Sequence, residues 1–295
     1  MYELQDEKIA SYADDTTSFV IGKSFNEVKI NLEKISVKMF NWLSNNQMKG
    51  NADKCQFIMN ESNTNLSIEI EGNRIHNKKE QKLLGVVFDN FLTFETHINS
   101  LCKKAGSKIS ALSRLTPYMN LQKKRLLMNA FFNSQFSYCP LIWMFHSRRL
   151  NNKINFLQER CLRLIYNDKS SFYGDLLKKN QSVCFHHRNI QYLAIELYKV
   201  KHDLSPPFLK EIFPQNESIF NGRKASFFTS RKINSTLSGS ESLSFLGPKI
   251  WDLVPNNIQN EISLHNFKMK IKKWIPEKCP CRICRKYIEG IGFIN

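Results

Sequence analysis

The sequence predicts an α+β fold, with short antiparallel strands in residues 1–92 and mainly helices after them. Three observations lead to this fold class. Apolar residues flank a short polar turn near the N-terminus, a capping signature precedes an amphipathic segment, and a long apolar stripe of helical spacing begins near residue 98. Because 42% of the 295 residues are hydrophobic, the chain has enough apolar surface for a buried core in one or two domains.

The N-terminal section predicts a hairpin followed by a helix. Residues 9–21 are apolar on both sides of a polar centre, which favours two strands joined by a tight turn that carries Asp14 and Asp15. Ser24 has a Glu three positions later, at Glu27, and this pair is typical of a helix start. Apolar residues at spacings of three and four then predict an amphipathic helix that ends at the polar pair at positions 45 and 46.

More strand is predicted after this helix. Apolar and β-branched runs predict three further strands, at residues 55–59, 66–70 and 82–88. The turn at residues 71–73 predicts a hairpin between the second of these strands and Arg74-Ile75. The section up to residue 92 is therefore expected to contain a hairpin, a helix and further antiparallel strands.

Helical patterns dominate after residue 93. An apolar stripe from Ile98 to Leu115 predicts one helix that stops near Pro117, and residues 205–248 are rich in Ser, Asn, Pro and Gly, which favours loop with short strands. Further helices are predicted at residues 121–135, 149–166, 186–202 and 264–274.

The charge balance indicates a polyanionic partner. The formal net charge is +17 and the sequence pI is about 9.5, which favours nucleic acid or an acidic membrane face. The longest apolar run is too short to span a bilayer, and residues 1–10 lack the apolar core of a signal peptide. We therefore expect an intracellular protein, of nucleus or cytoplasm, that binds nucleic acid and not a membrane.

A long stretch without acids supports this expectation. No Asp or Glu occurs from Thr96 to Gln158, whereas a solvated helix face normally carries both signs of charge. Lysine and arginine on such a surface bind phosphates by releasing counterions. The alternative is an ordinary solvated face, and the aromatic residues of this stretch are best interpreted as core. The basic residues are Lys103, Lys104, Lys108, Arg114, Lys123, Lys124, Arg125, Arg148, Arg149 and Lys153.

The tetrapeptide Tyr12-Ala13-Asp14-Asp15 carries the strongest chemical signal. Nucleotidyl transfer uses two divalent cations, and carboxylates on a sharp turn suit Mg²⁺, which prefers oxygen ligands. Two adjacent acids between apolar strands repel each other, and a bound cation would offset that cost. The alternative is a turn with two solvated aspartates, since Asp is common in turns.

The cysteines divide into two groups. Five are isolated among apolar residues, at positions 55, 102, 139, 161 and 184, and are interpreted as reduced core residues. Cys279, Cys281 and Cys284 form a cluster that suits Zn²⁺, and basic residues flank it. A fourth ligand is not evident, because His265 leads into a helix and the pair His186-His187 is interpreted as a helical surface feature. The alternative is a disordered basic tail with reactive thiols.

The ordered motifs resemble the reverse transcriptases of non-LTR retrotransposons, the LINE-like, jockey-type elements. The YADD hairpin resembles palm motif C of that family, and the helix that follows, with residues 51–55 (Asn-Ala-Asp-Lys-Cys), resembles motif D. Residues 82–89 resemble the strand and turn after motif D, and residues 94–98 resemble the start of the helical thumb. Residues 239–242 and 246–251 are also similar to segments of such elements in animals, so the resemblance covers essentially the whole chain.

The resemblance implies a function as an RNA-directed DNA polymerase with Mg²⁺, an RNA template and a DNA primer. It implies that Asp14 is a metal ligand with Asp15 as its neighbour, that Lys54 is a candidate general acid for the leaving pyrophosphate, and that Tyr12 packs under the primer end. The alternative for Lys54 is an ordinary surface lysine. The resemblance also implies a palm part at residues 1–92, a thumb-like region at 93–204, a loop-rich region at 205–275 and a basic, Cys-containing tail at 276–295.

The sequence also departs from the family pattern. The fingers and an upstream palm strand with another metal-binding Asp are not recognised before Tyr12. Since a two-metal centre needs that carboxylate, we expect the chain alone not to polymerise. A non-catalytic, nucleic-acid-binding remnant of a decayed retrotransposon is the alternative function.

Overall fold

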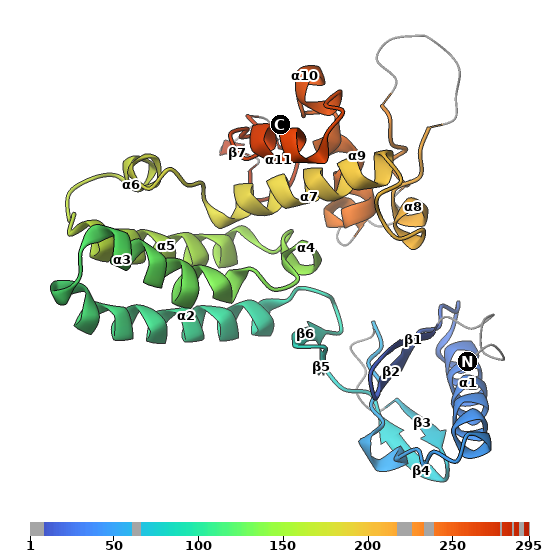
Figure 1. Cartoon of the computed structure of the whole chain (residues 1–295). Coiled ribbons are helices and arrows are strands. Elements are labelled where there is room, and N and C mark those ends of the chain that lie inside the picture. Colours follow the sequence, from blue (N-terminus) through green and yellow to red (C-terminus); the bar gives the residue numbers. More distant parts are fainter. Residues whose placement is uncertain are drawn as a thin grey trace. The chain divides into compact units, whose positions relative to one another are not determined.

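The chain divides into two compact units, residues 1–92 and 93–295, which are described separately (Figure 1). The structure is a computed structural model. It describes residues 9–60, 66–216, 226–232, 239–277, 279–284, 286–288 and 292–294. Predictions that involve Lys278, Arg285, or the parts of the predicted loop at 217–225 and 233–238 lie outside the described residues.

The first unit contains one long helix and three separate two-stranded antiparallel hairpins. The predicted N-terminal hairpin and the predicted hairpin around residue 71 are both present. Among the described residues the hairpins do not join into one sheet. The elements are β1 (Ile9–Tyr12), β2 (Asp15–Ser18), α1 (Phe25–Asn45), β3 (Ser67–Ile70), β4 (Asn73–His76), β5 (Glu80–Leu83) and β6 (Val86–Asp89).

The N-terminus of α1 follows from its capping residues. The Oγ atom of Ser24 accepts a hydrogen bond from the backbone N–H of Glu27 at 3.3 Å, and the Glu27 carboxylate accepts one from the N–H of Lys23 at 2.9 Å. These bonds satisfy backbone donors that the first helical turn leaves without partners. The helix ends at Asn45, so the predicted start and end are confirmed.

The predicted strand at residues 82–88 is wrong, because this segment turns back on itself. Leu83 pairs with Val86, and the two residues between them, Leu84 and Gly85, have φ angles of 43° and 87°. Positive φ at both central residues is the geometry of a tight hairpin turn, and Gly85 adopts it without strain. The predicted strand at residues 55–59 is also wrong: its described pairing is a single bridge between Phe57 and Asn77.

The second unit is helical, and its long helices lie side by side (Figure 1). The helix α2 packs along α5, while α9 and α11 both pack on α7. Among the described residues, no helix combines the length and the apolar character needed to cross a bilayer. The helices are α2 (Glu95–Leu115), α3 (Leu121–Leu127), α4 (Pro140–Trp143), α5 (Arg148–Tyr166), α6 (Tyr173–Lys179), α7 (Phe185–Lys201), α8 (Phe208–Ile212), α9 (Leu243–Trp251), α10 (Asn256–Gln259) and α11 (Leu264–Ile271). Two short strands follow, β7 (Lys286–Ile288) and β8 (Gly292–Ile294).

The helices with long apolar stripes agree with prediction. The helices α2, α5 and α7 begin and end within a few residues of the predicted positions, and α3 continues through a π turn and a 3₁₀ turn to Phe136. The predicted loop at 205–248 is wrong in part, because it contains α8 and most of α9. The α+β fold class is confirmed in its coarse form, with strands in the first unit and helices dominating the second.

The main core of the second unit surrounds α7. Apolar side chains of α7, α9 and α11 form one buried cluster, and Cys279, Cys281 and Ile283 from the C-terminal segment belong to it. Gly247 permits close packing inside this cluster, because a Cβ atom at this position would lie 2.6 Å from the Phe213 ring. The C-terminal segment is therefore part of the folded core of this unit.

Candidate functional site

The acidic pair lies at an exposed hairpin turn. Tyr12 pairs with Asp15, so Ala13 and Asp14 form the two-residue turn between β1 and β2. The side chains of Tyr12, Asp14 and Asp15 are all exposed, with Tyr12 at 70%. A cross-strand contact of 3.2 Å between the hydroxyls of Ser11 and Thr16 supports the hairpin next to the turn. The local fold therefore presents two carboxylates at one tip, where they are open to solvent and to a ligand.

The turn has an unusual backbone geometry. Ala13 has a φ of 54°, in the left-handed region that non-glycine residues seldom adopt. The other two hairpin turns of this unit have glycine at the second central position, Gly72 and Gly85. Strained positions of this kind occur preferentially at functional sites, where they aim neighbouring groups. The strained backbone at Ala13 directly precedes Asp14, the predicted metal ligand.

Lys54 ends a short 3₁₀ turn, Ala52–Lys54, and its side chain is exposed. The carboxamide of Asn51 caps this turn by accepting a hydrogen bond from the N–H of Asp53 at 3.1 Å. Within the described residues no ion pair joins Lys54 to Asp14 or Asp15. The role of Lys54 as a general acid therefore stays a prediction.

The predicted basic face on α2 is open to solvent. The buried side of the helix carries Ile98, Ala105, Ile109 and Leu112, and it packs against α5 and the segment after α3. Four basic side chains lie on the exposed part of the helix, and they have no carboxylate partner among the described residues. We call this set the α2 basic face: Lys103, Lys104, Lys108 and Arg114.

Other basic residues of the acid-free stretch make structural contacts. Arg149 pairs with Glu95 at the start of α2, and Lys153 donates to Asn99 Oδ1 at 2.7 Å. Arg125 donates to the backbone carbonyl of Asn180 at 3.2 Å. Lys123 and Arg148 are exposed, and Lys124 is half-buried. The α2 basic face is thus the larger group of cations that is not used for internal packing.

The aromatic residues of this stretch are mostly core, as predicted. Phe132, Phe136, Trp143 and Phe145 are buried. Phe131 is 43% exposed, and the ammonium group of Lys108 lies 5.8 Å from its ring centre. An exposed aromatic ring next to a lysine is the kind of surface on which a base can stack.

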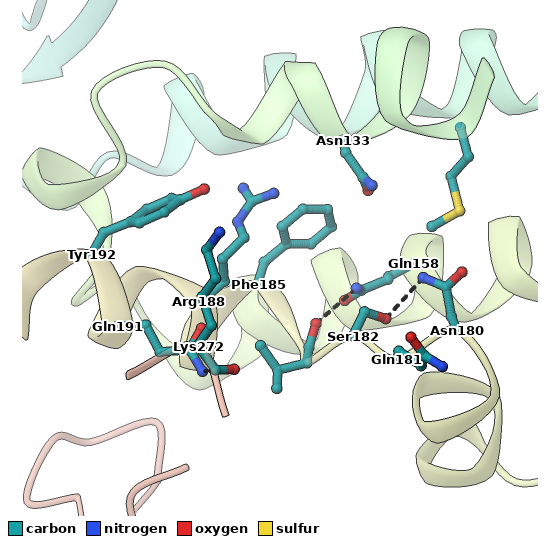
Figure 2. A pocket seen from close by; sticks show the side chains of 12 residues that line it. Asn133, Gln158, Asn180, Gln181, Ser182, Phe185, Arg188, Gln191, Tyr192 and Lys272 are labelled. Carbon is teal, nitrogen blue, oxygen red and sulfur yellow. Dashed lines mark hydrogen bonds between the residues drawn. The ribbon is translucent and has the colours of Figure 1, made fainter. Parts of the chain in front are cut away.

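A polar pocket of about 270 Å³ lies beside the N-terminal part of α7 (Figure 2). Arg188 lines it, with its guanidinium 4.3 Å from the Phe185 ring centre and bonded to the carbonyl of Phe136 at 2.7 Å. Gln158 of α5 donates to the carbonyl of Val183 at 3.1 Å. These bonds hold the segment before α7 against α5, and they fix the position where α7 begins.

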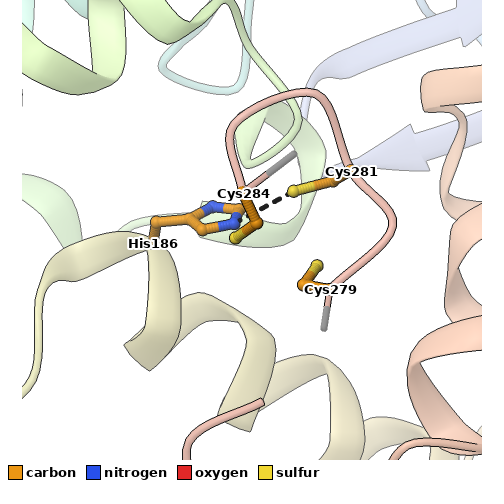
Figure 3. Close-up of side chains that lie close together, drawn as sticks. All are labelled: His186, Cys279, Cys281 and Cys284. Carbon is orange, nitrogen blue, oxygen red and sulfur yellow. Dashed lines mark hydrogen bonds between the residues drawn. The ribbon is translucent and has the colours of Figure 1, made fainter. Parts of the chain in front are cut away.

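The three C-terminal cysteines converge with a histidine of α7 (Figure 3). The sulfur atoms of Cys279, Cys281 and Cys284 and a ring nitrogen of His186 all lie within 4.8 Å of one another. Cys281 Sγ lies 3.2 Å from His186 Nε2. This is the potential metal-ligand group of the described residues, and it does not include Asp14 or Asp15. The predicted cysteine cluster is therefore present as a group of four side chains.

The interpretation of the histidine pair as a helical surface feature is wrong for His186. The pair does lie at the start of α7, but only 2% of His186 is exposed. Adjacent helical residues do point apart, so a single histidine joins the group while His187 does not. The sequence contained one signal for this contact, a histidine at a predicted helix start, but its partner Cys281 lies 95 residues further on.

The remaining cysteines agree in part with their prediction as reduced core residues. All eight cysteines are free. Cys102 and Cys161 are buried, and burial raises the pKa of their thiols to about 11 and about 12. Cys55, Cys139 and Cys184 are only half-buried, and the sulfur of Cys184 caps α7 by accepting from the N–H of His187 at 3.5 Å.

An exposed acidic hairpin in one unit and a basic helical face in the other are features expected of proteins that act on nucleic acid. Comparison with known proteins agrees with this class. The chain is 26% identical over 172 residues to the RNA-directed DNA polymerase from mobile element jockey of Drosophila melanogaster, and 28% identical over 162 residues to that of Drosophila funebris. It is 26% identical over 164 residues to the probable RNA-directed DNA polymerase from transposon BS of Drosophila melanogaster.

These matches identify the relatives of the chain. They cover 53% to 55% of this chain and 18% of each relative. No family model matches the chain, and no solved structure gives a significant match. The chain is a relative of the RNA-directed DNA polymerases of jockey-type, non-LTR retrotransposons, and its match spans less than a fifth of their length.

Proposed function

We propose that the chain is part of an RNA-directed DNA polymerase of a mobile element, with the first unit contributing to the palm and the second unit acting as the thumb. The observation that carries this proposal is the exposed YADD turn in a chain related to such polymerases. In this proposal Asp14 is a Mg²⁺ ligand, Asp15 is its neighbour, Tyr12 supports the primer end and Lys54 protonates the leaving pyrophosphate.

The donor set of the hairpin suits Mg²⁺ in part. Asp14 and Asp15 are exposed carboxylates, and Mg²⁺ commonly binds one or two carboxylates together with substrate phosphates. When bound, the metal would neutralise charge on the triphosphate during nucleotidyl transfer. Among the described residues no third Asp, Glu, His or Cys joins these carboxylates in a ligand group. The 295 residues therefore supply part of a two-metal centre.

The second unit supports a role in holding the nucleic acid. The α2 basic face presents four exposed cations without carboxylate partners among the described residues. Cations of this kind bind phosphates with little regard to base sequence, which suits a surface that grips a template–primer duplex. The proposed partners are an RNA template and a DNA primer. The alternative, a nucleic-acid-binding remnant without catalysis, uses the same surface.

A primer-extension experiment tests this function. The purified chain is incubated with an RNA template annealed to a labelled DNA primer, nucleotides and Mg²⁺. We expect the duplex to be bound but the primer not to be extended, because the metal centre lacks ligands. Asp14→Asn is the matched variant.

Two outcomes would contradict the proposal. Extension that needs both Mg²⁺ and Asp14 would show that the metal centre of the 295 residues is complete. Failure to bind the duplex at low salt would remove the proposed role of the second unit.

A further inference from the structure

The group formed by His186, Cys279, Cys281 and Cys284 has the composition of a structural zinc site. The four ligand atoms lie within 4.8 Å of one another. A tetrahedral zinc ion with Zn–S bonds of about 2.3 Å requires ligand atoms roughly 3.5–3.8 Å apart, so only a small contraction of the group is needed. Figure 3 shows the three sulfur atoms on a tight loop that faces the His186 ring. This inference does not depend on the proposed polymerase function.

Burial makes the group costly without a cation. Cys279 and Cys281 are 3% and 0% exposed, and His186 is 2% exposed. Hydrogen bonds from the thiols of Cys279 and Cys284 lower the pKa of Cys281, so a thiolate is favoured at the centre of the group. A buried anion needs a compensating charge, and a metal ion would supply it.

The surrounding structure holds the loop in place. The guanidinium of Arg282 donates to the carbonyls of Phe145 and His146 at 2.7 and 3.0 Å, and its backbone N–H donates to Glu241 at 3.2 Å. Ile283 is buried in the same cluster as the cysteines. These contacts come from three separate parts of the unit, so the loop is fixed independently of the four ligands.

We propose that these four side chains bind one Zn²⁺ ion, with Nε2 of His186 as the nitrogen ligand. Four protein ligands leave no open position for water or substrate, which is the arrangement of structural rather than catalytic zinc. A set of three sulfurs and one nitrogen favours Zn²⁺ over Mg²⁺ or Ca²⁺, which take oxygen ligands. The ion would tie the C-terminal segment to the start of α7, two regions separated by 95 residues.

Metal analysis and X-ray absorption spectroscopy test the site on the full chain, expressed and purified with Zn²⁺ in the medium. We expect about one zinc per chain, with sulfur neighbours at about 2.3 Å and a nitrogen neighbour at about 2.0 Å. His186→Ala should lose most of the bound zinc. His186→Cys should retain it, with a fourth sulfur replacing the nitrogen in the absorption spectrum.

Two variants serve as matched controls. His187→Ala and Cys184→Ser change a neighbouring histidine and a neighbouring thiol that lie outside the ligand group, and both should keep the zinc. If His186→Ala does not fold, the neighbours seen in the wild-type spectrum and the zinc content of His186→Cys still decide the question. A wild-type chain without zinc, a spectrum without the nitrogen neighbour, or His186→Ala with full zinc content would each overturn the proposal.

Discussion

Reversing the charges of the α2 basic face should weaken binding of an RNA–DNA duplex by roughly a hundredfold near 0.1 M salt. The variant replaces Lys103, Lys104, Lys108 and Arg114 by Glu. These side chains are exposed and have no carboxylate partner among the described residues, so their loss should remove phosphate contacts without removing internal bonds. Each lost contact reduces the salt dependence of the affinity by a slope of about one, so a decrease of about four is expected.

The control must separate a local effect from the change in net charge. Replacing Lys169, Lys178, Lys210 and Lys249 by Glu changes the net charge equally, at exposed positions of the same unit outside the acid-free stretch. Fluorescence anisotropy of a labelled duplex, measured at several salt concentrations, gives both the affinity and the slope. Equal losses in both variants would mean that the binding depends on total charge and not on the α2 basic face.

Truncating Trp251 to Ala should destabilise the second unit by roughly 3–5 kcal/mol. The Trp251 ring is fully buried, at 0% exposure, and it packs against the rings of Phe228 and Phe267 at centre distances of 5.7 and 6.1 Å. Removing it would leave a cavity in the middle of the cluster that joins α7, α9 and α11. A loss of this size is a large part of the stability of a typical domain.

Urea denaturation, followed by circular dichroism, measures this effect. Ile262→Ala is the matched control, because Ile262 lies in the same unit and is 97% exposed, so a change below about 0.5 kcal/mol is expected. Trp251→Phe should have an intermediate effect, because it keeps a ring in the cluster and removes the buried indole N–H, which has no hydrogen-bond partner. An unfolding midpoint that is the same in Trp251→Ala and the wild type would contradict the assignment of this core.

The parts of the fold that could be predicted are those with a strong local signal. The helices α1, α2, α5 and α7 have apolar residues at helical spacing over several turns, and α1 has a recognisable cap at Ser24. The segment 82–88 was predicted wrongly because its apolar residues run on through the turn, and the only local signal of that turn was Gly85. Short apolar runs do not distinguish one strand from a tight hairpin.

Tertiary contacts explain the other differences. The helix α9 contains Gly247 and Pro248, both poor helix formers, and its burial against Phe213 and neighbouring core residues outweighs their propensity. The contact of His186 with Cys281 joins residues far apart in the sequence, and neither periodicity nor motif spacing encodes such a contact. By contrast, the YADD turn is local, so both the hairpin and the exposed position of Asp14 followed from the sequence.

The central claim is that Asp14 binds a catalytic metal ion, and metal-directed cleavage of the chain tests it most directly. Fe²⁺ is substituted for Mg²⁺ in the presence of template–primer and a nucleotide, and ascorbate with peroxide then generates radicals that cut the backbone near the bound iron. We predict cleavage close to residues 12–16 that disappears in Asp14→Asn and that excess Mg²⁺ suppresses. Absence of cleavage at the hairpin, or the same cleavage in Asp14→Asn, would contradict the claim.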